Sequence, residues 1–352
     1  MNLIIEKFGI STDGIQVDLI TISNSNGSYI KVTNYGAKLV SLLVPDKNGK
    51  LDDVVLGYNT LEDYFNGNRF FGSNPGPFAG RISNASFVID GKTYIFTSND
   101  NNNLLHSGSK AIESVIWNYE VRGNRITFNY LYKESESGYP GDLNLFISYC
   151  WEDDHTLTIE YKATTSQPTH INLTHHSYFN LNGEKSTTIL DHLIYIISSN
   201  YVETDSDRIP TGRILEVSDT PLDLRKECLI ENIINSGYTP IKEALGADHF
   251  YIIDKKSKSE PDFCARVVAP ESGRVMEVYT SMPGIQFYSD NHDNGIIPGK
   301  NGQIYPKRCA FCLEPQHYPD APNIPSFPST LLLPGNTYHE TIRYHFDLTD
   351  NS

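Results

Sequence analysis

The sequence is poor in basic residues, with 28 Lys and Arg against 43 Asp and Glu and a formal net charge of -15. Proteins that bind nucleic acids or anionic membranes need lysine and arginine to neutralise phosphate groups. We therefore expect no nucleic-acid partner and no membrane partner. The acidic balance leaves open a neutral small-molecule ligand.

Long apolar runs are also missing. The best, HLIYII at residues 192–197, has the length of a core strand and is too short to span a bilayer. The first residues, MNLIIEKFGISTDG, lack the basic start and long apolar stretch of a signal peptide. The five cysteines are odd in number and scattered, as is typical of reduced thiols. Together these features predict a cytoplasmic protein. The sequence does not determine its oligomeric state, and we expect a monomer or a homodimer.

Long amphipathic helical patterns are absent, and strand patterns do not alternate with helical ones. This excludes doubly wound and (β/α)-barrel folds. The two helical candidates, residues 60–67 and 231–237, would each make only a turn or two. The sequence also has no compositional break and no long linker, so we expect a single domain over residues 1–352.

The pattern that dominates has a period of two, which is typical of strands. Apolar and polar residues alternate, for example, in residues 27–44, 143–165 and 339–348. Residues 85–96 read as two strands around Asp90-Gly91, a pair that suits a type I′ hairpin turn. The sequence therefore predicts an all-β protein, a large antiparallel β-sandwich with few short helices.

Polar side chains gather where the predicted strands end, and functional residues are often found at such positions. Histidine, arginine, carboxylate and amide groups beside aromatic rings suit a neutral ligand rich in hydroxyl groups, such as a sugar. The candidates are Arg81 in GPFAGRISNASF, His106 in NNNLLHSG, His170, His175 and His176 in HINLTHHSYFNLNG, Asp248 in GADHFYII, Gln286 in PGIQFYSDN and Glu314 in AFCLEPQHYPDAPN.

Each candidate also has a purely structural interpretation. Arg81 could pair with a surface acid, His106 could cap a loop, and Asp248 could form a turn by bonding its own backbone. Gln286 could satisfy the end of a neighbouring strand. Glu314 could pair with Lys307 or Arg308, which precede it closely in the chain. The residues alone leave these alternatives open.

Metal and cofactor sites have little support in the sequence. His175 and His176 are adjacent, so in a strand only one of them can face a given site. Cys309 and Cys312 form a C-x-x-C without a second pair at zinc spacing, and we interpret both as small apolar core residues. The G-x-S-x-G, P-loop and dinucleotide-binding patterns are missing. We expect no metal and no cofactor, which leaves acid–base chemistry by carboxylate and imidazole.

An ordered series of segments over nearly the whole chain resembles the aldose 1-epimerase (galactose mutarotase) family. Its parts lie in the order known for that family. They are VTNYGAKLVSLLVPDKNGKLDDVVLGY, AGRIS, LLHSG, SGYPGDL, NLTHHSYFNL, IPTGRI, ADHFYII, PGIQFYSDN and FCLEPQHYPDAPNIPSFPSTLLLPGNTY.

This resemblance implies a large β-sandwich that interconverts the α and β anomers of free hexoses such as galactose and glucose, without metal or nucleotide. It implies Glu314 as the catalytic base and His176 as the catalytic acid, with His106 near the ring oxygen. Arg81, Asp248 and Gln286 match residues that hold sugar hydroxyls. Ring opening needs both a base at the C1 hydroxyl and an acid at the ring oxygen, and groups with the ordinary pKa values of about 4.3 and 6.5 suit these tasks.

The sequence departs from the family pattern at several points. Gly76-Pro77 stands where the family often has a second arginine, and Pro315 follows the proposed base where Thr or Ser is usual. His175 and Ser107 replace an Asn and a Gly that are common in the family. Other classes stay possible: a hexose-phosphate epimerase, a glycoside hydrolase or lyase that uses Asp248 with Glu314, or a sugar-binding module.

Overall fold

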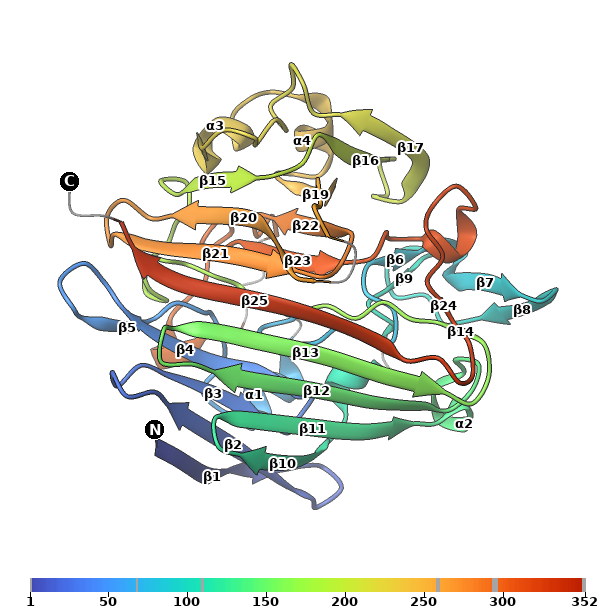
Figure 1. Cartoon of the computed structure of the whole chain (residues 1–352), viewed down its shortest axis with the longest axis horizontal. Coiled ribbons are helices and arrows are strands. Elements are labelled where there is room, and N and C mark those ends of the chain that lie inside the picture. The colour runs from blue at the N-terminus through green and yellow to red at the C-terminus, as the bar shows by residue number, and fades with distance from the viewer. Residues whose placement is uncertain (1, 68, 109–110, 258–259, 293–296, 350–352) are drawn as a thin grey trace.

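A computed structural model describes residues 2–67, 69–108, 111–257, 260–292 and 297–349. Strands dominate it, and its helices are short (Figure 1). Among the described residues, none of the helices has both the length and the apolar composition needed to cross a membrane.

The largest sheet has nine strands, and all its neighbouring strands are antiparallel. Its long strands lie side by side across the molecule in Figure 1. In spatial order the strands are β10 (Asn118–Arg122), β11 (Arg125–Tyr132), β12 (Leu143–Trp151), β13 (Thr156–Thr165), β25 (Tyr338–Leu348), β21 (Arg274–Thr280), β20 (Asp262–Val268), β15 (Leu193–Ile196) and β18 (Cys228–Leu229).

Two five-stranded sheets accompany it. The first contains β1 (Asn2–Ile10), β2 (Gln16–Ser23), β3 (Tyr29–Thr33), β4 (Leu39–Pro45) and β5 (Leu51–Asp53). The second has the order β17 (Pro210–Glu216), β16 (Asn200–Thr204), β19 (Asp248–Ile252), β22 (Gly284–Tyr288) and β23 (Cys312–Gln316).

The remaining elements are small. The two-stranded sheets pair β14 (Thr169–His170) with β24 (Leu331–Leu332), β6 (Arg81–Ile82) with β9 (Leu104–Leu105), and β7 (Ser86–Ile89) with β8 (Lys92–Ile95). The described α-helices are α1 (Leu61–Asn66), α2 (Glu134–Ser137), α3 (Ile230–Ile234) and α4 (Thr239–Glu243). Short 3₁₀ turns include η1 (Ser83–Ala85), η3 (Ile112–Ser114), η4 (Lys300–Gly302) and η5 (Ala321–Asn323).

One apolar core joins the three larger sheets. Ile159 of β13, Ile22 of β2 and Phe287 of β22 belong to the same buried cluster, and each is at most 1% exposed. Because side chains alternate along a strand, one face of each sheet enters this core. The sequence prediction of an all-β sandwich with few short helices is confirmed. The single domain over residues 1–352 stays a prediction, and residues 1 and 350–352 at its ends lie outside the described residues.

Two local predictions are also confirmed. Asp90 and Gly91 connect β7 to β8 with φ angles of 50° and 79°, which are the positive values that a type I′ turn requires at both central positions. Both helical candidates form helices of one or two turns, α1 and α3. Thr60 caps α1, because its side chain accepts a hydrogen bond from the Asp63 amide at 3.2 Å.

The alternation along β22 leads to a stability prediction. Ile285 is fully buried, so Ile285→Ala should lower the free energy of unfolding by about 2–5 kcal/mol. Ile214 in β17 is 47% exposed, and Ile214→Ala serves as the matched control, with an expected change within about 0.5 kcal/mol. Urea unfolding followed by fluorescence measures both, and equal losses would contradict the assignment of these two faces.

Candidate active site

Three neighbouring strands build one wall of the site. Gln286 of β22 lies opposite Phe250 of β19 on one side and opposite Glu314 of β23 on the other, while Asp248 lies opposite Tyr288. Because side chains on one face of a sheet recur every second residue, all five point to the same side. The intervening residues Ile285, Phe287 and Leu313 point into the core. A single register therefore places the apolar residues in the core and the polar residues at the site.

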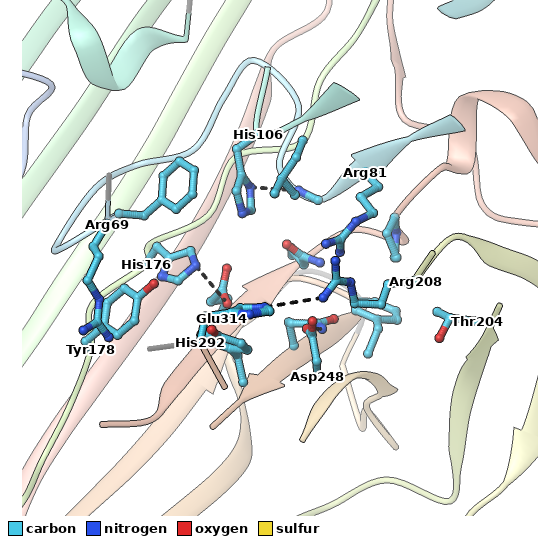
Figure 2. A pocket seen from close by; sticks show the side chains of 18 residues that line it. Arg69, Arg81, His106, His176, Tyr178, Thr204, Arg208, Asp248, His292 and Glu314 are labelled. Carbon is cyan, nitrogen blue, oxygen red and sulfur yellow. Dashed lines mark hydrogen bonds and ion pairs between the residues drawn. The ribbon is translucent and has the colours of Figure 1, made fainter. Parts of the chain in front are cut away.

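The polar face opens into a pocket of about 940 Å³, its mouth included (Figure 2). All six residues predicted as catalytic or sugar-binding line it. The lining residues are Arg69, Phe70, Gly80, Arg81, Leu105, His106, His176, Tyr178, Thr204, Arg208, Asp248, Phe250, Gln286, Tyr288, His292, Glu314, Gln316 and Pro319.

The carboxyl group of Glu314 faces the imidazole of His176. Glu314 Oε1 lies 3.5 Å from His176 Nε2, and their side chains are 4% and 6% exposed. The His176 amide donates to the Ser73 carbonyl at 2.9 Å, which fixes the segment opposite β23. The alternative in which Glu314 pairs with Arg308 is not found, since Arg308 donates to the Ser289 carbonyl at 3.2 Å.

Of the three histidines in the HINLTHHSYFNLNG segment, only His176 lines the pocket. The fully buried His175 points elsewhere, with its Nε2 2.7 Å from the Ser177 hydroxyl. His170 Nδ1 lies 2.9 Å from the hydroxyl of Thr330, also outside the pocket. The prediction that His175 and His176 face different ways is thus confirmed.

His106 follows directly after β9 and has a φ of 51°, an uncommon value for a residue other than glycine. The Gly80 amide donates to its Nδ1 at 3.2 Å. A neutral imidazole that accepts at Nδ1 carries its proton on Nε2. The ring therefore offers an N–H donor, and its edge-to-face packing at 5.5 Å from the His176 ring places that donor beside the proposed acid.

The sugar-binding candidates are held by polar partners of their own. Arg81 Nε lies 2.7 Å from Asp100 Oδ2, so Arg81 has the acidic partner of the structural interpretation and also lines the pocket. Gln286 Nε2 donates to Asp248 Oδ1 at 2.6 Å. This bond orients both side chains, and it leaves the remaining carboxylate and amide oxygens to accept bonds from hydroxyl groups.

Burial moves the pKa values of the central groups far from ordinary. The pKa of Glu314 lies well above its usual value because burial disfavours the carboxylate, an effect that Asp248 reinforces and Arg81 opposes. Burial lowers the pKa of His176 to about 3, and the positive charges of Arg69 and Lys38 lower it further. The pKa of His106 is also well below its usual value, first because of burial and then because of His176 and Arg81. The expected ordinary pKa values do not hold, and burial favours the uncharged forms of all three groups.

Among the described residues, one group could hold a metal ion: one ligand atom from each of His106, His176 and Glu314 lies within 4.8 Å of the others. Histidines that bind metals normally donate their second ring N–H to an acceptor. His106 shows the reverse pattern, because its Nδ1 accepts from Gly80 and its Nε2 carries the proton. This donor set fits a hydrogen-bonding role better than a metal. The metal-free site stays a prediction.

Sequence reasoning missed several pocket residues. They are Arg69, Phe70, Tyr178, Thr204, Arg208, Phe250, Tyr288 and His292. Phe250 and Tyr288 stand two residues after Asp248 and Gln286 in β19 and β22, so the alternation of strands could have indicated them. Arg69 and Arg208 show no comparable sequence pattern, because packing between segments distant in the chain brings them to the pocket.

The strand that carries Glu314, β23, begins at Cys312. The residue before it, Phe311, instead pairs with Phe179 through backbone bonds of 2.7 and 2.9 Å. Cys309 and Cys312 are both buried and free, consistent with core residues. Pro315 is tolerated because β23 is an edge strand, where a missing amide donor breaks no ladder.

Comparisons with known proteins agree with this geometry. Residues 18–345 match the family model described as aldose 1-epimerase. The galactose mutarotase of Rattus norvegicus is 39% identical over 344 residues, which is 98% of this chain and 94% of the relative. The aldose 1-epimerase of Escherichia coli is 29% identical over 97% of this chain and 98% of the relative.

A solved structure gives the same result in three dimensions. The aldose epimerase homologue from Caenorhabditis elegans superposes with a TM-score of 0.86 at 32% identity, over 94% of this chain and 99% of that one. The chain therefore belongs to the aldose 1-epimerase family, as its segments suggested.

The buried histidines predict a pH dependence of stability. Burial lowers the pKa of His175 to about 3, whereas an unfolded histidine titrates near 6.5. Between these values the unfolded chain binds more protons, so this contribution to stability is complete above about pH 6.5 and is lost as the pH falls. His175→Gln should therefore reduce the slope of unfolding free energy against pH by up to about 1.4 kcal/mol per pH unit.

Urea unfolding at a series of pH values from 7 to 4 measures this slope. His339 is exposed, and His339→Gln serves as the control for replacement of a histidine outside the core. An unchanged slope in His175→Gln would contradict the neutral, buried state of His175.

Proposed function

We propose that this protein interconverts the α and β anomers of free aldohexoses, with galactose and glucose as the substrates to test first. The observation that carries the proposal is the buried pair of Glu314 and His176, 3.5 Å apart in a pocket lined by hydroxyl-binding side chains. The names of the relatives, galactose mutarotase and aldose 1-epimerase, support this isomerase activity.

The chemistry moves two protons. Glu314 takes the proton of the C1 hydroxyl as the bond between C1 and the ring oxygen breaks, and the bond's electrons go to the ring oxygen. His176 gives that oxygen a proton, which yields the open aldehyde. The aldehyde turns about the C1–C2 bond, and attack on its other face reverses both proton transfers. The product is the other anomer, and the protein returns to its starting protonation state.

The shifted pKa values suit a pair that shares one proton. The raised pKa of Glu314 and the lowered pKa of His176 favour the arrangement in which Glu314 holds this proton. Ring opening starts from the alternative arrangement, with Glu314 ionised and His176 protonated, which holds the same number of protons. The distance of 3.5 Å between Oε1 and Nε2 is short enough for the proton to pass between them after a small movement.

The other predicted residues receive supporting roles. His106 donates its Nε2 hydrogen toward the ring oxygen, where it stabilises negative charge during opening. Arg81, Asp248 and Gln286 bind the remaining hydroxyl groups and hold the sugar with C1 over Glu314. Orientation of this kind contributes to rate as well as to affinity.

The alternative classes make distinct predictions. A hydrolase that used Asp248 with Glu314 would release reducing ends from a disaccharide.

A hexose-phosphate epimerase needs free cationic groups that can bind the phosphate. Arg69, Arg81 and Arg208 do line the pocket, so the lack of a family arginine at Gly76-Pro77 is no argument against it. However, Arg69 and Arg81 are already paired with Asp290 and Asp100, which favours a neutral substrate.

Loss of either catalytic group should nearly abolish turnover. We expect Glu314→Gln and His176→Gln each to lower kcat by about 10²–10⁴-fold with a small change in KM, because each removes one proton transfer. Polarimetry of freshly dissolved α-D-galactose and α-D-glucose measures the rate after subtraction of the spontaneous reaction.

His170→Gln is the matched control, since His170 is also a buried histidine but lies outside the pocket. Its activity should stay close to that of the wild type. Folded wild-type protein that accelerates neither sugar would overturn the proposed function. Full activity of Glu314→Gln would overturn the assignment of the base alone.

The shared proton also predicts the pH profile. The pair loses its proton only when the pH exceeds the raised pKa of Glu314, and gains a second only when the pH approaches the lowered pKa of His176, about 3. The profile of kcat/KM, which reports on the free enzyme, should therefore show no acid limb at the ordinary histidine value of about 6.5, and on the acid side it should fall only toward pH 3. A single acid limb centred near pH 6.5 would contradict a shared proton.

A further inference from the structure

The imidazole of His176 lies between two aromatic rings. Its centroid is 5.6 Å from that of Phe70 and 5.0 Å from that of Tyr178, with interplanar angles of 27° and 23°. His176 as a whole is 4% exposed. Stacking on both faces prevents the ring from turning, and so it fixes the direction in which Nε2 points toward Glu314.

Tyr178 in turn packs against Arg69. The guanidinium carbon of Arg69 lies 5.0 Å from the centre of the Tyr178 ring and 4.8 Å from that of Phe71. Such packing of a planar cation on aromatic rings is specific to arginine, because lysine presents only a point charge. In Figure 2, Arg69 and Tyr178 lie together on the side of His176 remote from Arg81 and Asp248.

Arg69 forms an ion pair with Asp290, and the two side chains are 4% and 2% exposed. Asp290 also bonds to the segment that leads into β23. The Cys309 thiol donates to its Oδ2 at 3.3 Å, and the Arg308 amide donates to its carbonyl at 2.8 Å. The ion pair therefore joins the wall that carries His176 to the strand that carries Glu314.

A buried ion pair has a large desolvation cost, and apolar residues of similar volume are often as stable. The contacts of this pair suggest a role other than stability. Arg69 packs on Tyr178, which stacks on His176, and Asp290 bonds to the segment that leads to Glu314. Arg69 also lines the pocket, so a direct bond to the sugar is the competing interpretation. The two interpretations differ in what they do to kcat and KM.

We propose that Arg69 and Asp290 are positioning residues, which press Tyr178 against His176 and thereby set the separation of the His176 imidazole and the Glu314 carboxyl group. This inference rests on the roles proposed above for His176 and Glu314. Neither residue of the pair takes or gives a proton to the sugar.

The test is Arg69→Lys, which keeps the charge and removes the planar stack. We expect kcat for α-D-galactose to fall about 10²-fold, the cost of a small misplacement of catalytic groups, while KM stays within about twofold. Arg125→Lys is the matched control, because Arg125 pairs with Glu160 at a partly exposed position of the large sheet. Its kcat should equal that of the wild type.

A double-mutant cycle shows whether Arg69 acts through Tyr178. In the Tyr178→Leu background, Arg69→Lys should lower kcat little further, because the ring on which Arg69 packs has been removed. Equal losses in both backgrounds would overturn the proposal, as would an unchanged kcat in folded Arg69→Lys. A raised KM with unchanged kcat would assign Arg69 to the sugar and also overturn it.

If Arg69→Lys fails to fold, the double replacement Arg69→Met with Asp290→Leu removes the pair without leaving a buried charge. The proposal expects the same loss of kcat, and full activity overturns it. Failure of the underlying function is distinguishable, because it would appear as an inactive wild type or a fully active Glu314→Gln. Folding is checked throughout by the urea unfolding midpoint.

Discussion

Exclusion of water from the Glu314–His176 pair is the constraint on which the rest of the structure depends. The side chains of Glu314 and His176 are 4% and 6% exposed, and burial of this degree favours the uncharged form of each group. The proposed sharing of one proton therefore requires that the fold hold both groups rigidly. Strand pairing holds Glu314, stacked rings hold His176, and a buried ion pair joins the two supports.

The backbone around Glu314 is fastened on several sides. The Tyr344 hydroxyl donates to the Leu313 carbonyl at 3.0 Å, and the Thr174 hydroxyl donates to the Pro315 carbonyl at 2.6 Å. Thr174 belongs to the same segment as His176, so this hydrogen bond also connects the segments that carry the proposed acid and the proposed base. Sites built on strands of this kind hold their geometry better than sites on loops.

The sequence was sufficient for the fold class and for the polar residues of β19, β22 and β23, because the alternation of side chains depends only on neighbouring positions. It was insufficient for Arg69, which is 221 residues away from its partner Asp290. Contacts of this length leave no local pattern. The same is true of the pKa values, because burial of Glu314 is a property of the assembled core. The sequence therefore gave the chemical groups but not their protonation states.

The alternation of core-facing and pocket-facing residues in β22 and β23 also limits which insertions this sequence tolerates during evolution. Insertion of one residue in β22 or β23 would exchange their faces, sending Gln286 or Glu314 into the core and Ile285 or Leu313 into the pocket. Such a change would disrupt the core and the candidate site together. The turn between β16 and β17, which carries Arg208 at the pocket, lies outside this strand register. Changes in that turn can therefore alter the pocket lining while β22 and β23 keep their spacing.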